Sequence, residues 1–110
     1  MTSATLNRVT LIGFVGEDPE LKFVNPSASP VCNFKIATHK NYKTANGEYK
    51  EETTWHSLSA WNVLAEYIAE NIKKGSKVYV DGEITMSSAP DKNGGRRDYY
   101  SILVNEIKLL

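Results

Sequence analysis

The chain has 110 residues, enough for one hydrophobic core and too few for a second folded unit, so we expect a single domain over residues 1–110. Hydrophobic residues make up 41% of the chain and charged residues 24%, which is an ordinary globular composition, and the apolar runs are too short to cross a bilayer. The formal net charge is zero, and the single cysteine excludes an internal disulfide and a cysteine-based four-ligand zinc site.

The N-terminal residues have neither the apolar core of a secretory signal nor the arginine-rich character of a transit peptide. We therefore expect a soluble protein without membrane contact, which stays in the compartment that makes it. Its one thiol, Cys32, is expected to be buried and inert.

The first predicted strand covers residues 7–14, where Val9 and Leu11 alternate with polar residues before Gly13 and Gly16 break the pattern. A loop over residues 25–30 follows, by its composition of Asn, Pro and Ser. The next strand has an apolar face with Cys32, Phe34 and Ile36. Its other face, with Asn33, Lys35 and Ala37, is expected to be solvent-facing.

Asn46 and Gly47 predict the turn of a hairpin whose exposed, basic tip extends past the rest of the sheet. Its second arm leads into residues 53–61, where two tryptophans and two serines share one face: Trp55, Ser57, Ser59 and Trp61. The other face, with His56 and Leu58, is better suited to a core. We therefore expect both indole rings to be uncovered, about 20 Å apart, as separate platforms of the kind on which nucleic-acid bases stack.

A helix is predicted after Asn62, which can cap it, with Leu64, Ile68 and Ile72 on one face and Gly75 at its end. Two more strands follow, residues 78–84 and 101–105, separated by the turn Asn93-Gly94-Gly95.

This order of elements predicts a mainly β protein with an oligonucleotide-binding fold, a five-stranded Greek-key barrel with one helix between strands 3 and 4. Some other small α+β sheet is the alternative. In the barrel, the basic residues lie on the two long loops that flank one face. The cations expected to bind phosphate are Arg8, Lys35, Lys40, Lys43, Lys50, Lys92, Arg96 and Arg97, although a solvated surface charge is an equally good interpretation for any one of them.

Several motifs closely resemble bacterial single-stranded DNA-binding proteins, from Asn7 to about Leu110: Leu11-Ile12-Gly13, Gly16-Glu17-Asp18-Pro19-Glu20, Thr54-Trp55-His56, Leu64-Ala65-Glu66 and Lys74-Gly75-Ser76-Lys77-Val78-Tyr79-Val80-Asp81-Gly82. The resemblance implies a homotetramer, with a homodimer as the alternative, that wraps single-stranded DNA. It also implies that Tyr42, Trp55 and Trp61 stack bases and that His56 lies near subunit contacts. Tyr79 is a further candidate for the subunit interface.

Two departures from that family are visible. Ala89 and Pro90 stand where many relatives carry another stacking tryptophan. The acidic-tipped tail that recruits enzymes in the family is absent, so this chain does not support tail-mediated recruitment; either a tail has been removed or the chain is a short paralogue.

The sequence thus predicts a cytoplasmic, nucleoid-associated protein that binds and protects single-stranded DNA with little sequence preference during replication, recombination and repair. No catalytic residue, metal site or cofactor is expected, because a phosphate-binding loop, a nucleophile elbow and a two-metal carboxylate cluster are all missing from the sequence. The alternative is a protein-interaction adaptor of a replication or restart complex, built on the same barrel, with weak or no DNA binding.

Overall fold

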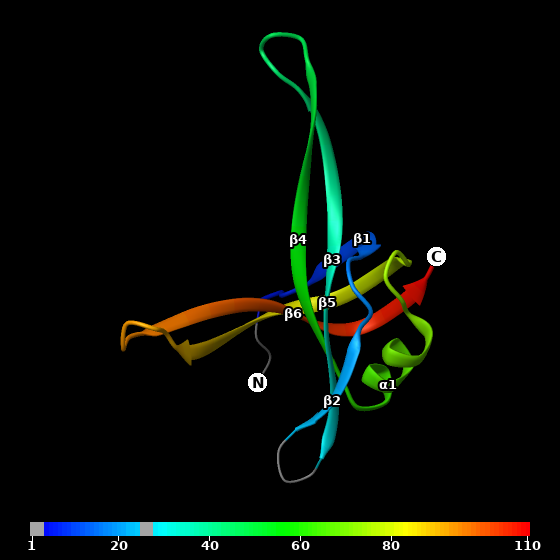
Figure 1. The fold of residues 1–110 in the computed structure, drawn as a ribbon, viewed down its shortest axis with the longest axis vertical. Coiled ribbons are helices and arrows are strands. Elements are labelled where there is room, and N and C mark those ends of the chain that lie inside the picture. Colours follow the sequence, from blue (N-terminus) through cyan, green and yellow to red (C-terminus); the bar gives the residue numbers. More distant parts are fainter. Residues whose placement is uncertain (1–3, 25–27) are drawn as a thin grey trace.

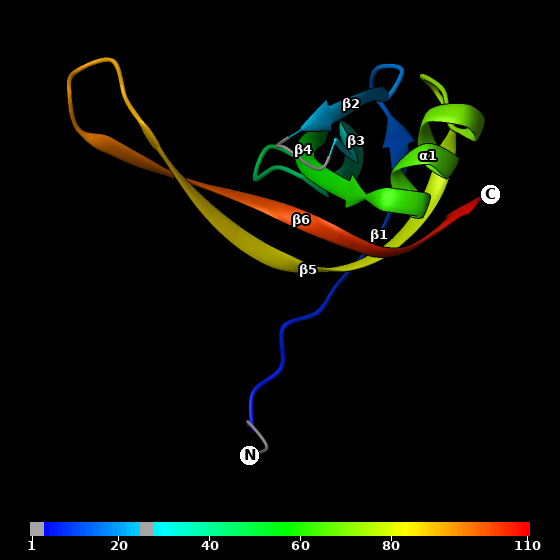
Figure 2. The same ribbon diagram turned by 90° about the horizontal axis from the view of Figure 1, so that it is seen from below.

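The computed structural model describes residues 4–24 and 28–110, so the predicted loop at 25–30 lies partly outside the described residues. Six strands and one helix follow one another along the chain (Figure 1), namely β1 (Val9–Val15), β2 (Glu20–Val24), β3 (Ser29–Lys43), β4 (Tyr49–Trp61), α1 (Asn62–Asn71), β5 (Lys77–Pro90) and β6 (Arg96–Leu109). The helix is drawn beside one end of the sheet in Figure 2 and packs against β3 and β4.

The strands close into a barrel. Their order is β1-β5-β6-β4-β3-β2, and β1 also pairs with β3, which completes the ring. The β4–β6 pair is parallel and the other pairs are antiparallel. This arrangement confirms the predicted oligonucleotide-binding fold.

One strand, β2, was not predicted, and because of it the helix follows the fourth strand in chain order instead of the third. Both β1 and β2 pair with β3, through Val15↔Ile36 and Glu20↔Asn33. They are therefore two parts of one barrel strand, interrupted by a corner at residues 16–19 that includes the buried Pro19. The barrel itself remains five-stranded.

Two hairpins extend as arms well beyond the barrel, in different directions (Figure 1). The first arm is formed by β3 and β4, which stay paired as far as Lys43↔Tyr49, and the predicted Asn46-Gly47 turn closes it, with Gly47 at a φ of 82°. The second is formed by β5 and β6, which stay paired as far as Pro90↔Arg96.

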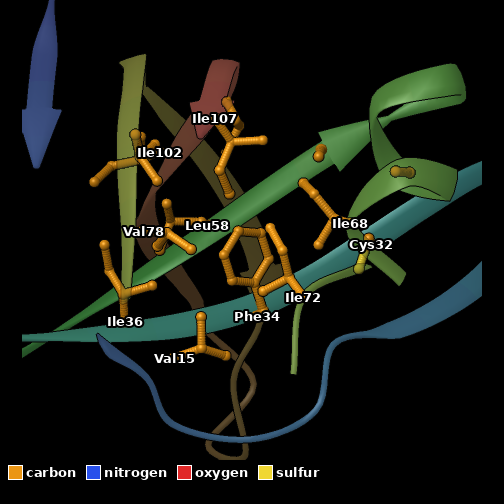
Figure 3. Close-up of a cluster of buried hydrophobic side chains, with 14 residues drawn as sticks. Val15, Cys32, Phe34, Ile36, Leu58, Ile68, Ile72, Val78, Ile102 and Ile107 are labelled. Atoms are coloured by element: carbon orange, nitrogen blue, oxygen red, sulfur yellow. The ribbon is translucent and has the colours of Figure 1, made fainter. Parts of the chain in front are cut away.

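The core lies inside the barrel, where side chains from β1, β3, β4, β5, β6 and α1 meet (Figure 3). The helix supplies Ala65 and Ile68, and Ile72 follows at its end; all three are fully buried. Cys32 is also fully buried, as predicted, and burial raises the pKa of its thiol. The interior is thus filled by apolar residues, as a small barrel requires.

Two local predictions were wrong. Asn62 does not cap the helix: Trp61 takes the N-cap position, with no side-chain cap hydrogen bond in the described part of the chain, and Asn62 is the first helical residue. Gly13 does not break the strand pattern: β1 continues through it to Val15, and a Cβ at this position would collide with the carbonyl oxygen of Ala37. The glycine permits a close approach of two strands.

Candidate nucleic-acid interface

Both tryptophans lie on the outer face of β4. The exposed fraction is 57% for Trp55 and 41% for Trp61, whereas Leu58 and Ala60, on the alternate face, are buried in the core. The expected assignment of the two faces is therefore observed. Uncovered indole rings of this size have a large apolar surface available for a ligand.

Each ring is opposed across the strand pair by a small or medium apolar residue of β3. Trp55 pairs with Ala37, and Trp61 pairs with Val31. Ala37 and Val31 are buried, at 4% and 5% exposed, although neither belongs to the core cluster. Cross-strand neighbours share a face, so we attribute their burial to the indole rings. The prediction that Ala37 faces water was wrong, because Ala37 lies between Trp55 of β4 and Phe14 of β1.

Gly16, in the corner between β1 and β2, provides the seat of Trp55. A Cβ at Gly16 would lie 2.5 Å from Cζ3 and 3.0 Å from Cη2 of the indole, so the six-membered ring rests against the glycine backbone. The Gly16 N–H donates to the carbonyl oxygen of Lys35 at 3.0 Å. Asp18 further fixes the corner, because its Oδ1 accepts a hydrogen bond of 2.7 Å from the Lys74 N–H. These two hydrogen bonds thus fix the backbone on which the Trp55 ring rests.

A second exposed aromatic group, which was not predicted from the sequence, lies two strands away from Trp55, on the far side of Ala37. Phe14 is 44% exposed. It pairs with Ala37 of β3 on the β1 side, whereas Trp55 pairs with the same alanine on the β4 side. The ring centroid of Phe14 is 6.3 Å from that of His39. The Nζ of Lys77 is 6.0 Å from the Phe14 ring centroid. The signal was present, because strand alternation places Phe14 on the face opposite Val15, but the prediction ended the strand at residue 14.

Tyr42 lies on the β3–β4 arm and is 40% exposed. It pairs with Lys50. Ala37, the β3 partner of Trp55, is an odd number of residues away from Tyr42 on the same strand. Because side chains alternate along a strand, the side chain of Tyr42 points to the face opposite that of Trp55. The arm twists along its length, as two-stranded ribbons do (Figure 1). The structure therefore separates Tyr42 from the row of residues around Trp55.

The β3–β4 arm has an exposed tip, as predicted, but is not basic. Three cations on this arm are balanced by three acids: Lys40, Lys43 and Lys50 against Glu48, Glu51 and Glu52. The strand register sets Glu52 directly opposite Lys40. The sequence count ended at Lys50 and so missed two of these acids. The Nζ of Lys43 lies 5.9 Å from the ring centroid of Tyr49.

The β5–β6 arm has the larger positive excess, with Lys92, Arg96 and Arg97 against Asp91 and Asp98. The guanidinium carbon of Arg97 lies 5.8 Å from the ring centroid of Tyr99, within cation–π range. The Nε of Arg96 donates to Ser88 Oγ at 3.1 Å, so its orientation along the arm is partly fixed.

The remaining two predicted phosphate contacts differ in their surroundings. Arg8 forms an ion pair with Asp81, with 3.0 Å between Nη2 and Oδ2, and the hydrogen bond to this carboxylate raises the pKa of Arg8. Its charge is therefore already partnered. Lys35 is exposed on β3, opposite Ser57, and lines the same cavity as Trp55.

That cavity, of about 810 Å³, opens beside the place where β4 and β6 meet. In the described part of the chain these strands pair at Leu58↔Ile102 and Ser59↔Leu103; on the N-terminal side of these residues they diverge into the two arms. Tyr99 and Tyr100 of β6 line the cavity together with Trp55. They come from a strand about forty residues further along the chain, so the sequence alone did not associate them with Trp55.

The two predicted interface residues lie in different places. His56 is half-buried, and its Nε2 is 2.9 Å from Thr38 Oγ1. Tyr79 is half-buried on β5, opposite Ile12 of β1. One chain therefore does not bring them together, and their role in subunit contacts stays a prediction.

Within residues 4–24 and 28–110, no group of three or more His, Cys, Asp or Glu side chains is arranged to hold a metal ion. The helix in the same ranges is neither long nor apolar enough to span a bilayer.

A closed barrel of this topology, with indole rings uncovered on its outer face and two projecting arms, has the architecture of an oligonucleotide-binding protein. The single-strand binding protein family matches residues 6–110, and the chain belongs to this family.

Named relatives agree with this assignment. The chain is 40% identical over 106 residues to the single-stranded DNA-binding proteins of Neisseria meningitidis serogroup A and serogroup B, which covers 96% of this chain and 60% of each relative. It also resembles a solved structure described as Plasmodium falciparum SSB complex with ssDNA, with a TM-score of 0.87 and 27% identity, over 100% of this chain and 99% of that one. The chain thus spans 60% of the length of the Neisseria relatives.

Proposed function

We propose that this protein binds and protects single-stranded DNA with little sequence preference, as a non-enzymatic component of replication, recombination and repair. The observation that carries the proposal is the position of Trp55, which is 57% exposed on the outer face of the barrel and seated on Gly16. Every nucleobase has a π-face, so a fixed indole ring accepts any base of an unpaired strand. Bases in a duplex are already stacked on one another and are not accessible to such a ring without unpairing.

Trp61 and Tyr42 are the other two proposed stacking residues. Trp61 is 41% exposed at the end of β4, six residues from Trp55, so the two indoles serve different bases. Tyr42 is on the β3–β4 arm, where a strand leaving the barrel surface would pass. The proposal therefore describes a path with separate platforms, along which each stacked base contributes about 1–3 kcal/mol.

Phosphate contacts accompany the stacked bases in this proposal. Lys35 is next to Trp55, and the β5–β6 arm supplies a positive excess through Lys92, Arg96 and Arg97. The charge-balanced β3–β4 arm and the partnered Arg8 are expected to contribute less. For a single strand, the logarithm of the binding constant should fall with the logarithm of salt concentration with a slope of about −0.7 per neutralised phosphate.

Assembly belongs to the same proposal. One barrel contacts a short stretch of strand, so wrapping a longer strand needs several copies in closed symmetry. We propose a homotetramer, with His56 and Tyr79 near subunit contacts. The molecular mass in solution, with and without a long oligonucleotide, tests this; a monomer under both conditions would contradict it.

The main test is a titration of the protein with oligo-dT, followed by quenching of tryptophan fluorescence and repeated at several salt concentrations. Trp55→Ala should weaken binding about 5- to 150-fold, the equivalent of one stacked base, while Trp55→Phe, which keeps a ring, should retain most of the affinity. Thermal melts of both variants show whether the barrel remains folded.

A lower melting temperature with unchanged affinity for Trp55→Ala would mean that the indole is structural. If the unaltered protein shows neither quenching nor a salt response, the protein-interaction adaptor becomes the better explanation of the exposed aromatic residues.

A further inference from the structure

The cleft between the two arms is longer than the Trp55 cavity alone. A second cavity of about 470 Å³ adjoins the first, and four residues line both: Trp55 and Ser57 of β4, and Tyr100 and Ser101 of β6. The two cavities adjoin at these four residues, and we treat them together as one cleft. The cleft runs between β4 and β6, from the point where these parallel strands stop pairing and diverge.

Aromatic rings from both strands border this cleft: Trp55 of β4, and Tyr99 and Tyr100 of β6; of the two tyrosines, only Tyr100 lines both cavities. Trp55 is 57% exposed and Tyr100 is 71% exposed, so neither ring is used in packing the core. Two small hydroxyl side chains, Ser57 of β4 and Ser101 of β6, line both cavities as well. Two exposed rings with small residues beside them form a slot that suits a flat, apolar ligand with polar edges.

The charges around the cleft indicate how such a ligand would be oriented. Glu17, Asp18 and Glu20 line the end of the larger cavity near the β1–β2 corner, where they would repel a phosphate. Cations lie elsewhere: Lys35 lines the same cavity, and Arg97 lies against the ring of Tyr99 on the β5–β6 arm. An uncharged base therefore fits inside the cleft, with its phosphates toward Lys35 and Arg97.

We propose that Trp55 and Tyr100 form a two-strand clamp that takes one unpaired nucleobase into the cleft between the arms. This inference rests on the proposed binding of single-stranded DNA and adds a stacking residue on β6, the strand opposite the tryptophans. Such a residue would supply a platform on the side of the molecule where Ala89, on the neighbouring β5, offers no ring. Ala89 itself pairs with Arg97, three residues before Tyr100.

The test compares Tyr100→Ala, Tyr100→Phe and Tyr67→Ala in the oligo-dT titration. Tyr67 is an exposed tyrosine on α1 that lines neither cavity, so it is the matched control. Loss of one stacked base predicts about 5- to 150-fold weaker binding for Tyr100→Ala, with near-normal binding for the other two. Because Tyr100 is mostly exposed, its truncation should leave the melting temperature nearly unchanged.

A second measurement separates stacking from charge or folding effects. An all-abasic oligonucleotide of equal length carries the same phosphates without bases, so the difference between the unaltered protein and Tyr100→Ala should vanish with it. If the unaltered protein binds oligo-dT and Trp55→Ala weakens binding but Tyr100→Ala does not, the clamp is refuted and the proposed function stands. If the unaltered protein does not bind oligo-dT at all, the proposed function fails first.

Discussion

Replacing Gly16 by alanine perturbs the proposed Trp55 platform without touching the ring itself. The added Cβ would lie 2.5 Å from Cζ3 of Trp55, which is about 1 Å inside the separation at which two carbon atoms attract. The backbone at Gly16 is held by its hydrogen bond to Lys35, whereas the indole is more than half exposed. The ring should therefore move outward by about 1 Å to restore contact distance, and the barrel should stay intact.

Because the ring moves in a region open to solvent, we expect the free energy of unfolding to fall by less than about 1 kcal/mol. Binding should lose part of the stacking energy, up to the limit of about 1–3 kcal/mol for a whole platform. The assay is urea unfolding together with oligo-dT titration of Gly16→Ala, Trp55→Ala and the double variant. In the Trp55→Ala background, the glycine substitution should have almost no further effect on affinity, because coupled residues are not additive.

Two results would refute this reasoning. Unchanged affinity and an unchanged tryptophan emission spectrum in Gly16→Ala would mean that Gly16 does not seat the ring. Equal losses of affinity in the presence and absence of Trp55 would mean that the alanine acts on the barrel and not on the platform.

Three further predictions concern other parts of the molecule. Gly82→Ala should destabilise the barrel by about 1–3 kcal/mol, because its Cβ would collide with the carbonyl oxygen of Leu103; equal urea midpoints would contradict this. Arg97→Gln should reduce the salt slope of oligonucleotide binding by about 0.7, whereas Arg8→Gln should reduce it less because Arg8 is paired with Asp81; titrations at several salt concentrations compare the two. The raised pKa of the buried Cys32 thiol leaves less thiolate at neutral pH, so a thiol reagent should label it only as the protein unfolds, and rapid labelling of the folded protein would count against this.

The sequence was sufficient for features that depend on neighbouring residues. The period-two alternation in residues 53–61 correctly separated the buried Leu58 and Ala60 from the exposed tryptophans. Asn46 and Gly47 correctly marked a hairpin turn, because a glycine at positive φ fits such a turn without strain. The order of strands and helix favoured the barrel even though β2 was missed, because β1 and β2 together occupy one position in it.

The proposed site could be predicted only in part, because most of its contacts join residues far apart in the chain. Alternation places Trp55 outside, but only barrel closure brings Gly16 beneath it and Tyr100 across the cleft from it. The register of β3 on β4 set Glu52 against Lys40, which a count along the chain missed. Side-chain direction is a local property of a strand, whereas its partners depend on which strands become neighbours. The sequence by itself therefore determined that Trp55 and Trp61 face outward, and the tertiary structure alone decided what lies beside each of them.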